Sequence, residues 1–185
     1  MEQSQKEQLA RKIWITRKCR INASERLLSD AKYLEILNVY FSIVAIIISL
    51  ISLVTESSRL SLASLIVSIV LTITIMYANS AGLRDRSSLL KQNYIELQSL
   101  LDQLSFANDD DKECIKSIGS KYLELLKSSE NHTPIDLYQL KKSSTDPDLK
   151  LSKVERRDYY CRRIWRITWK VILVVLPVVI ISIWH

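Results

Sequence analysis

Serine and threonine residues recur at helical spacing within two long apolar runs of this chain. In the second run, three hydroxyl residues follow one another at every fourth position, and another serine lies seven positions before the middle one. In the first run, two serines are one heptad apart and a third lies near the same face. This spacing gathers the hydroxyl groups of each run on one side of a helix. The residues are Ser42, Ser49 and Ser52 in the first run and Ser61, Ser64, Ser68 and Thr72 in the second.

Two roles are open for these hydroxyl groups. Small residues let membrane helices approach closely, and a hydroxyl that bonds across such an interface contributes about 0.6 kcal/mol. Alternatively, several copies of the chain would turn the hydroxyl groups toward an aqueous lumen. One hairpin cannot surround a pore, so this second role requires an oligomer. The hydroxyl residues are therefore candidates for lining a pore or for packing the hairpin.

Catalytic and metal-binding patterns are missing from the sequence. It contains no GxGxxG, GxxxxGK[ST], HExxH or GxSxG motif, and it has only two histidines. The acids Asp109, Asp110, Asp111 and Glu113 lack the alternating ligands and the central glycine of a calcium-binding loop. Because neither a nucleophile with its base nor a metal site can be named, we expect no enzyme activity and no cofactor.

The composition favours helices. Glycine occurs twice and proline three times, which disfavours turn-rich β folds and glycine-rich phosphate-binding loops. The three cysteines, Cys19, Cys114 and Cys161, are far apart and odd in number. They suggest no disulfide framework, and we expect them to be reduced.

The two apolar runs predict a transmembrane hairpin. Residues 37–54 form a run of 18 residues without a charge, and residues 60–78 form one of 19. A helix of 18 residues is about 27 Å long, close to the hydrocarbon thickness of a bilayer. Residues 55–59 form a short link between the runs. Neither run has a polar face of any width, which argues against helices buried in a soluble core.

A third apolar stretch lies at the C-terminus. Its uninterrupted part, 171–184, has 14 residues and is about 21 Å long as a helix, too short to span. Adding 167–170 brings it to about 27 Å, with Trp169 and Trp184 at the two interfaces and Pro177 tolerated within it. We predict a third span; a re-entrant or surface-lying tail is the alternative. The expected membrane-interface anchors are Arg162, Arg163, Trp165, Arg166, Trp169 and Lys170.

Basic residues predict the orientation of these spans. Residues 1–36 carry eight Lys/Arg against five acids, and residues 150–170 carry eight against two. Cytoplasmic flanks are enriched in Lys/Arg, so we expect the N-terminus and the segment between the second and third spans inside. The hairpin tip and His185 then lie outside. The prediction is a membrane protein with several passes and a cytoplasmic N-terminus.

The net charge of +6 follows from the same distribution. Residues 80–149 carry nine basic and twelve acidic side chains, so the positive excess lies beside the predicted spans. Anionic lipid headgroups are its expected counter-charge, and direct nucleic-acid binding is disfavoured.

An apolar heptad pattern follows the hairpin. Its spacings of seven, four, three, four and three predict a helix with one apolar seam. The N-terminal helix offers a weaker stripe that could cover this seam, while self-association of the chain stays open. The seam residues are Leu83, Leu90, Tyr94, Leu97, Leu101 and Leu104.

Together these patterns predict an all-α membrane protein. It consists of a transmembrane helical hairpin, coiled-coil-like cytoplasmic helices before and after it, and a third C-terminal transmembrane helix. The expected segments are a cytoplasmic N-terminal helix at 1–36, the hairpin at 37–79, amphipathic helices at 80–127, a linker at 128–149, a basic juxtamembrane helix at 150–166 and the third span at 167–185.

Two segments beside the hairpin resemble a known family. NASERLL at 22–28 precedes the first span, and LKQNYIELQSLLDQL at 90–104 follows the second. With the order of the parts, they make residues 10–129 similar to the SLATT family, the SMODS and SLOG-associating two-transmembrane effector domains of bacterial conflict systems. The third span departs from the two-span core of that family.

The resemblance implies a membrane effector that forms pores or otherwise disrupts the membrane when a partner sensor detects an invader, leading to abortive infection. It also implies a partner encoded nearby, such as a nucleotidyltransferase, a SLOG protein or a reverse transcriptase. The alternative is a membrane-anchored scaffold or sensor that recruits a cytoplasmic partner and does not conduct.

Overall fold

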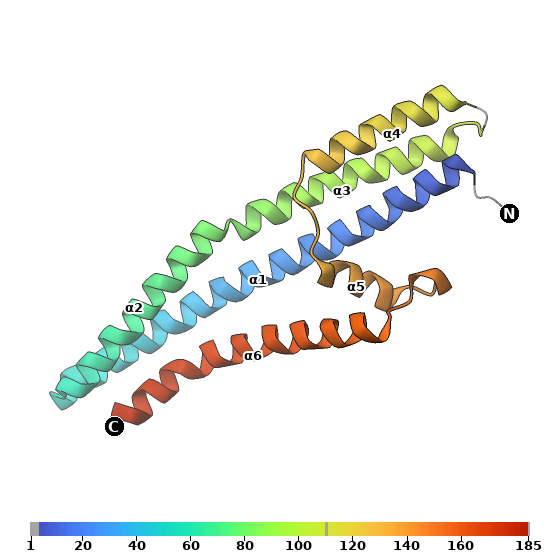
Figure 1. The fold of residues 1–185 in the computed structure, drawn as a ribbon. Coiled ribbons are helices and arrows are strands. Elements are labelled where there is room, and N and C mark those ends of the chain that lie inside the picture. The colour runs from blue at the N-terminus through green and yellow to red at the C-terminus, as the bar shows by residue number, and fades with distance from the viewer. Residues whose placement is uncertain (1–3, 110, 185) are drawn as a thin grey trace. The chain divides into compact units, whose positions relative to one another are not determined.

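The computed structural model describes residues 4–109 and 111–184, the side chains at 180, 181, 183 and 184 excepted. This part of the chain is mostly helical and contains no strand, which confirms the all-α prediction. The helices, labelled in Figure 1, are α1 (Gln5–Thr55), α2 (Ser58–Ala81), α3 (Leu83–Phe106), α4 (Lys112–Lys127), α5 (Pro134–Ser143), the short 3₁₀ helix η1 (Pro147–Leu149) and α6 (Lys153–Trp184).

Helix α1 is one uninterrupted helix of 51 residues. It contains neither glycine nor proline, the residues that most often end or kink a helix. The expected N-terminal helix and the expected first span are therefore parts of a single helix, with no break near residue 36.

The chain divides into two compact units. Unit 1 consists of Met1–Leu28 and Arg84–Tyr159, and unit 2 of Ser29–Leu83 and Tyr160–His185. Helices α1 and α6 each contribute to both units. The chain also passes from unit 2 to unit 1 between Leu83 and Arg84, just after the end of α2.

Unit 1 is built on the first half of α1, which lies beside α3 and α4 (Figure 1). Its apolar core contains the buried side chains of Ile13, Leu97, Leu100, Leu104 and Ile118. Each of the three helices contributes to this core because each has an apolar stripe on one face.

Capping residues start the later helices of unit 1. The Asp111 carboxylate accepts a hydrogen bond from the Cys114 amide at 2.9 Å and begins α4. Thr133 and Asp136 form a capping box at the start of α5, with Pro134 at its first position.

Unit 2 contains the second half of α1, all of α2 and most of α6. Its core consists of buried side chains from α1 and α2, with Leu173 of α6 packed against them. These buried side chains are Leu34, Leu37, Phe41, Ala45, Ile48, Ala63 and Val67.

Gly82 separates α2 from α3. Its φ of +52° is in the left-handed region, where a glycine has no side-chain penalty, and its amide donates to the Asn79 carbonyl. Helix α3 starts at the next residue, Leu83.

Candidate functional site in the helical hairpin

Small and apolar residues hold the two helices of the hairpin together. On α1, Phe41, Ala45 and Ile48 recur every three or four positions and are buried. They pack against Ala63 and Val67 of α2, both fully buried. Alanine at facing positions lets two helix backbones approach closely, as is typical of helix pairs in membranes.

The tip of the hairpin is fixed by local hydrogen bonds. The buried Ser52 hydroxyl donates to the Ser57 carbonyl at 3.0 Å, and the Ser57 amide donates to the Ser52 carbonyl at 3.2 Å. Glu56 has a φ of +48° and makes the reversal between these residues. The Ser57 hydroxyl then accepts from the Leu60 amide and caps α2.

The hydroxyl groups inside the spans differ in their partners. Ser64 donates to the Ala45 carbonyl of the opposite helix at 3.2 Å. Ser42, Ser68 and Thr72 each donate to a carbonyl four residues earlier in their own helix. Such intrahelical bonds satisfy a hydroxyl where water is excluded.

Three of the predicted hydroxyl residues are exposed on the single chain. They are Ser49 on α1 and Ser61 and Thr72 on α2. Ser64 and Ser68 are half-buried, and Ser52 is buried at the tip. The predicted set therefore divides into residues that hold the hairpin and residues on its surface.

The surface of the hairpin is strongly apolar. Ile46 is 60% exposed, Leu53 is 74% and Ile73 is 61%. In the most apolar 18-residue stretch of each, 22% of the residues of α1 and 11% of those of Ser58–Phe106 are buried. A core helix of a soluble protein is mostly buried, so these exposures favour a lipid-facing surface.

Within the described residues, two helices are long and apolar enough to cross a membrane: Gln5–Thr55 and Ser58–Phe106, which joins α2 and α3. The third predicted span belongs to α6. Two predictions for its end lie outside what the structure describes: the interfacial side chain of Trp184 and the external position of His185.

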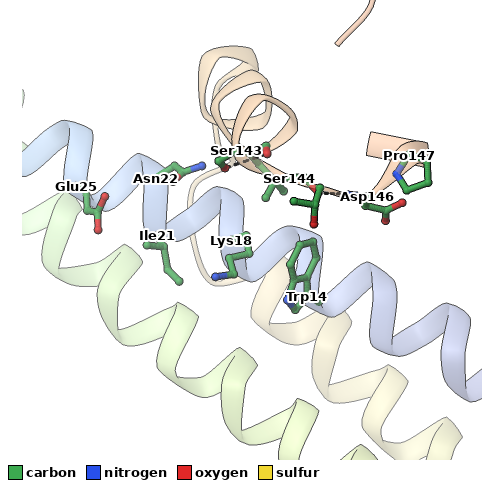
Figure 2. A pocket seen from close by; sticks show the side chains of 11 residues that line it. Trp14, Lys18, Ile21, Asn22, Glu25, Ser143, Ser144, Asp146 and Pro147 are labelled. Atoms are coloured by element: carbon green, nitrogen blue, oxygen red, sulfur yellow. Dashed lines mark hydrogen bonds between the residues drawn. The ribbon is translucent and has the colours of Figure 1, made fainter. Parts of the chain in front are cut away.

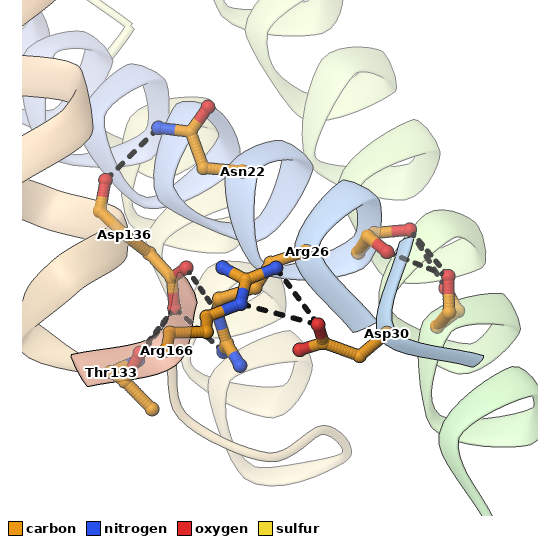
Figure 3. Close-up of polar contacts among 8 residues, drawn as sticks. Asn22, Arg26, Asp30, Thr133, Asp136 and Arg166 are labelled. Carbon is orange, nitrogen blue, oxygen red and sulfur yellow. Dashed lines mark hydrogen bonds and ion pairs between the residues drawn. The ribbon is translucent and has the colours of Figure 1, made fainter. Parts of the chain in front are cut away.

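Helix α6 is attached to α1 by a polar cluster in unit 2. The Asp30 carboxylate accepts from Arg166 at 2.9 Å (Figure 3). It also accepts from the Lys170 ammonium at 2.8 Å. The Lys170 ammonium also lies 4.7 Å from the centre of the Tyr33 ring. The Tyr33 hydroxyl donates to the Lys170 carbonyl at 2.7 Å and the Tyr40 hydroxyl to the Val174 carbonyl at 3.1 Å.

We call Asp30, Tyr33, Tyr40, Arg166 and Lys170 the α6 clamp. Arg166 and Lys170 were predicted from the sequence as membrane-interface anchors, whereas the three α1 residues were not predicted. The sequence does carry a signal for them: an acid lies close to the start of an apolar run and is followed by two tyrosines one heptad apart. The four other predicted anchors, Arg162, Arg163, Trp165 and Trp169, are exposed on α6.

The predicted heptad residues lie mainly within unit 1. Leu90, Leu97 and Leu104 are buried, and Tyr94 and Leu101 are half-buried. Leu97, Leu101 and Leu104 contribute to the packing of the core that contains Ile13 of α1. The remaining heptad residue, Leu83, is half-buried and packs against the core of unit 2 instead.

Leu100 is also buried in unit 1, although it is outside the a/d pattern. Helix α4 contributes Ile118 to the same core, so α3 packs with two neighbours and buries a wider stripe than a two-helix seam.

A buried polar network in unit 1 was not foreseen. The Asp136 carboxylate is 1% exposed and accepts from Arg26 at 2.8 Å and from the Thr133 amide and hydroxyl (Figure 3). The Asn22 side chain donates to the Asp136 carbonyl at 2.9 Å. These bonds join α5 to α1, and they connect residues more than 100 positions apart.

Arg20 is buried beside this network. Its Nη1 donates to the Leu125 carbonyl at 3.0 Å, while Nε and Nη2 have no partner among the described residues. Burial lowers the pKa of the Arg20 guanidinium from its ordinary value, and the nearby Tyr122 opposes this change.

The buried cysteine of unit 1 is not activated as a nucleophile. Burial, reinforced by the Asp136 carboxylate, raises the pKa of the Cys19 thiol to about 12, so the reactive thiolate is scarce at neutral pH. Across the described residues, no group of three or more His, Cys, Asp or Glu side chains could hold a metal ion.

Comparison with known families identifies the group to which the chain belongs. The model of SMODS and SLOG-associating 2TM effector domain family 5 matches residues 2–184, a range that includes α6. Searches of curated proteins and of solved structures each find no match. The chain is thus a member of SMODS and SLOG-associating 2TM effector domain family 5, one of the SLATT families.

Proposed function

We propose that this effector oligomerises in the bacterial inner membrane and permeabilises it when a partner sensor is triggered, causing abortive infection. The observation that carries the proposal is the surface of the hairpin, which is apolar and free of charge along both spans yet presents exposed hydroxyl groups. An apolar surface suits lipid, whereas a hydroxyl group in lipid gains from a second chain or from water.

The exposed Ser49, Ser61 and Thr72 are the proposed pore-lining residues. The hydroxyl groups of Ser49 and Ser61 have no hydrogen-bond partner among the described residues. In an oligomer, these side chains would face neighbouring hairpins or a water-filled lumen. Ser52 and Ser64 are proposed to hold each hairpin together, because both donate to backbone carbonyls within it.

Unit 1 is the proposed cytoplasmic part that responds to the partner. The family name gives SMODS and SLOG proteins as associates of this group, and the resemblance adds nucleotidyltransferases and reverse transcriptases encoded nearby. The proposed topology places residues 1–36, 80–127 and 128–149 inside and the tip outside, following the excess of Lys/Arg beside the spans.

The basic turns of α6 are proposed to contact anionic headgroups. Arg162 and Arg163 are exposed there together with Trp165 and Trp169. Tryptophan and basic side chains are both enriched at the membrane–water boundary.

The test follows membrane potential in bacteria that express the chain with its neighbouring genes. A potential-sensitive dye is recorded while phage infection supplies the trigger. We expect depolarisation to precede growth arrest. Growth arrest at an unchanged potential would count against permeabilisation.

Paired variants locate the conducting surface. Ser49→Leu combined with Ser61→Leu should abolish depolarisation while membrane insertion and oligomer size are retained, because leucine fills and dehydrates a narrow lumen. The matched control is Leu50→Ile with Leu62→Ile, which changes exposed neighbours of these serines without changing their polarity. The control should depolarise like the unmodified chain.

A non-conducting scaffold is the second candidate function. The observation in its favour is that Ser64, Ser68 and Thr72 are bonded within the hairpin, which is sufficient to explain these hydroxyls as packing residues. A scaffold predicts that the Ser49→Leu and Ser61→Leu pair leaves growth arrest intact. It also predicts that the partner is recovered with the chain from detergent-solubilised membranes.

A further inference from the structure

A groove of about 680 Å³ lies within unit 1, between α1 and the segment that connects α5 to η1 (Figure 2). Its size falls within the range of roughly 300–1,000 Å³ that is typical of small-molecule sites. The residues that matter for recognition are Trp14, Lys18, Ile21 and Glu25 of α1, Leu140 of α5 and Pro147 of η1.

Several polar groups of the groove already have partners within the chain. The Asn22 amide donates to the Asp136 carbonyl at 2.9 Å. The Ser144 hydroxyl accepts from the Asp146 amide at 3.1 Å, and the Asp146 carboxylate pairs with Arg11 at 3.3 Å. A ligand would have to displace these bonds before it could bind the same atoms. These groups would therefore contribute little binding free energy.

Lys18 and Glu25 are different. Neither side chain has an ion pair or hydrogen bond to any described residue. They are seven positions apart on α1, a separation of about 10 Å along a helix. The groove therefore has one unpaired positive end and one unpaired negative end.

Trp14 lies one turn before Lys18. Its ring is half-buried, and the Lys18 ammonium is 5.9 Å from the ring centre. An aromatic ring beside an ammonium suits a ligand with a flat ring and a negative charge at a short distance from it. A cationic ligand is disfavoured at this end by the charge of Lys18, although an indole ring alone would attract one.

We propose that this groove binds a small aromatic anion, a ring bearing a carboxylate or a phosphate. The ring packs against Trp14 and the apolar wall formed by Ile21, Leu140 and Pro147, and the anionic group binds Lys18. Glu25 repels an anion from the opposite end and sets the orientation. The site lies within unit 1 and does not depend on whether the hairpin conducts.

The test measures binding to the purified full chain in lipid nanodiscs by equilibrium dialysis, with empty nanodiscs subtracted. Four probes are compared: phenyl phosphate, phenylacetate, inorganic phosphate and benzyl alcohol. We expect saturable binding of phenyl phosphate, of phenylacetate or of both, and much weaker binding of the other two. The first two probes distinguish a phosphate ligand from a carboxylate ligand.

Variants assign the binding to this groove. Lys18→Gln should weaken it roughly tenfold or more, since a hydrogen bond to a charged group is lost. Trp14→Ala should weaken it to a similar degree through loss of the ring contact. Lys12→Gln is the matched control, because Lys12 is an exposed lysine of the same helix outside the groove, and it should leave the affinity unchanged.

Three results would overturn the proposal: no saturable binding of either aromatic anion, binding of benzyl alcohol as strong as that of the anions, or equal affinities for Lys18→Gln and Lys12→Gln. Circular dichroism checks that each variant is folded. If Trp14→Ala loses helicity, the affinities of Lys18→Gln and Lys12→Gln decide whether the anion binds in this groove.

Discussion

Asp136 illustrates how one side chain can join distant parts of this molecule. Its carboxylate accepts from Arg26, from the Thr133 amide and from the Thr133 hydroxyl, so it both caps α5 and ties that helix to α1. It is 1% exposed, and the Arg26 side chain is 19% exposed. A buried carboxylate is tolerated only when its oxygens are bonded in this way.

Replacing Asp136 by alanine should therefore weaken the attachment of α5. The loss of a buried carboxylate that is bonded on both oxygens costs about 3 kcal/mol, because the ion pair from Arg26 to Asp136 and the cap of α5 are both lost. We expect hydrogen exchange of the α5 amides to accelerate roughly a hundredfold. The control is Asp148→Asn, because the Asp148 side chain is 70% exposed and its pairing with Arg11 contributes at most about 1 kcal/mol. Equal exchange in the two variants would contradict the role given to Asp136.

Cys19 should be chemically inert while unit 1 is folded. Its pKa is raised to about 12, so at pH 8 the thiol remains protonated as well as buried. Mass spectrometry after maleimide labelling at pH 8 should show modification of the exposed Cys161 and none of Cys19. Because the folded state favours the protonated thiol, stability should fall as the pH rises from 9.0, the ordinary pKa of a cysteine thiol, toward 12. Rapid labelling of Cys19 in the native protein would show that unit 1 opens readily.

At the scale of elements, the α6 clamp attaches α6 to α1 within unit 2. The α6 clamp supplies one acid, two basic side chains and two tyrosine hydroxyls, and Leu173 adds apolar packing. Asp30 has two cationic partners, Arg166 and Lys170. Its removal takes away the carboxylate that both of them share.

Replacing Asp30 by alanine should loosen α6 from α1 within unit 2. Spin labels on the exposed Ile36 and Val171 report the distance between the two helices. We expect the distance distribution to broaden in Asp30→Ala, because Arg166 and Lys170 then repel each other without a counter-charge. Lys32→Ala, on an exposed neighbouring position of α1, should leave the distribution unchanged. A narrow distribution in Asp30→Ala would mean that the contacts of α6 other than those to Asp30 are sufficient to hold it.

The two glycines of the chain should respond in opposite directions to alanine. Gly82 has a φ of +52°, so Gly82→Ala costs about 1 kcal/mol in backbone strain, although an added Cβ would meet nothing within 4 Å. Gly119 lies inside α4, where an added Cβ would lie at an ordinary contact distance of 3.9 Å from Leu9. Gly119→Ala should therefore stabilise unit 1 by about 0.5 to 1 kcal/mol. Thermal unfolding in detergent measures both, and a lower midpoint for Gly119→Ala would contradict this assignment.

At the scale of the whole molecule, the distribution of charge and apolar surface decides how the chain sits in a bilayer. The apolar side chains of the hairpin are exposed along both helices, while the regions with excess Lys/Arg lie at 1–36 and 150–170. This arrangement makes the tip the part expected to leave the cytosol.

Reporter fusions test this topology. Alkaline phosphatase inserted after Ser57 should be active, because it folds only outside the cytoplasm, whereas a fusion ahead of residue 4 should be inactive. A fluorescent protein at the same two positions should give the opposite pattern. Activity of the phosphatase at the N-terminus, or its inactivity after Ser57, would exclude the proposed orientation.

The sequence by itself determined the helical fold class, the two long apolar helices and the resemblance to the family, because hydropathy and helical periodicity depend on residues close together in the chain. Local patterns also indicated that α3 has an apolar seam, but not that Leu100 and Ile118 widen it. They divided α1 at residue 36, where the helix continues without a break.

Only the tertiary structure decided which polar groups meet. Asp30 and Arg166 are 136 positions apart, and Arg26 and Asp136 are 110 apart. The spacing within either segment carries no information about such a pair, because the contact depends on the path of all the helices between them. The same holds for Ser64, whose periodicity placed it on a small polar face but whose partner, the Ala45 carbonyl, is set by how closely the two spans pack.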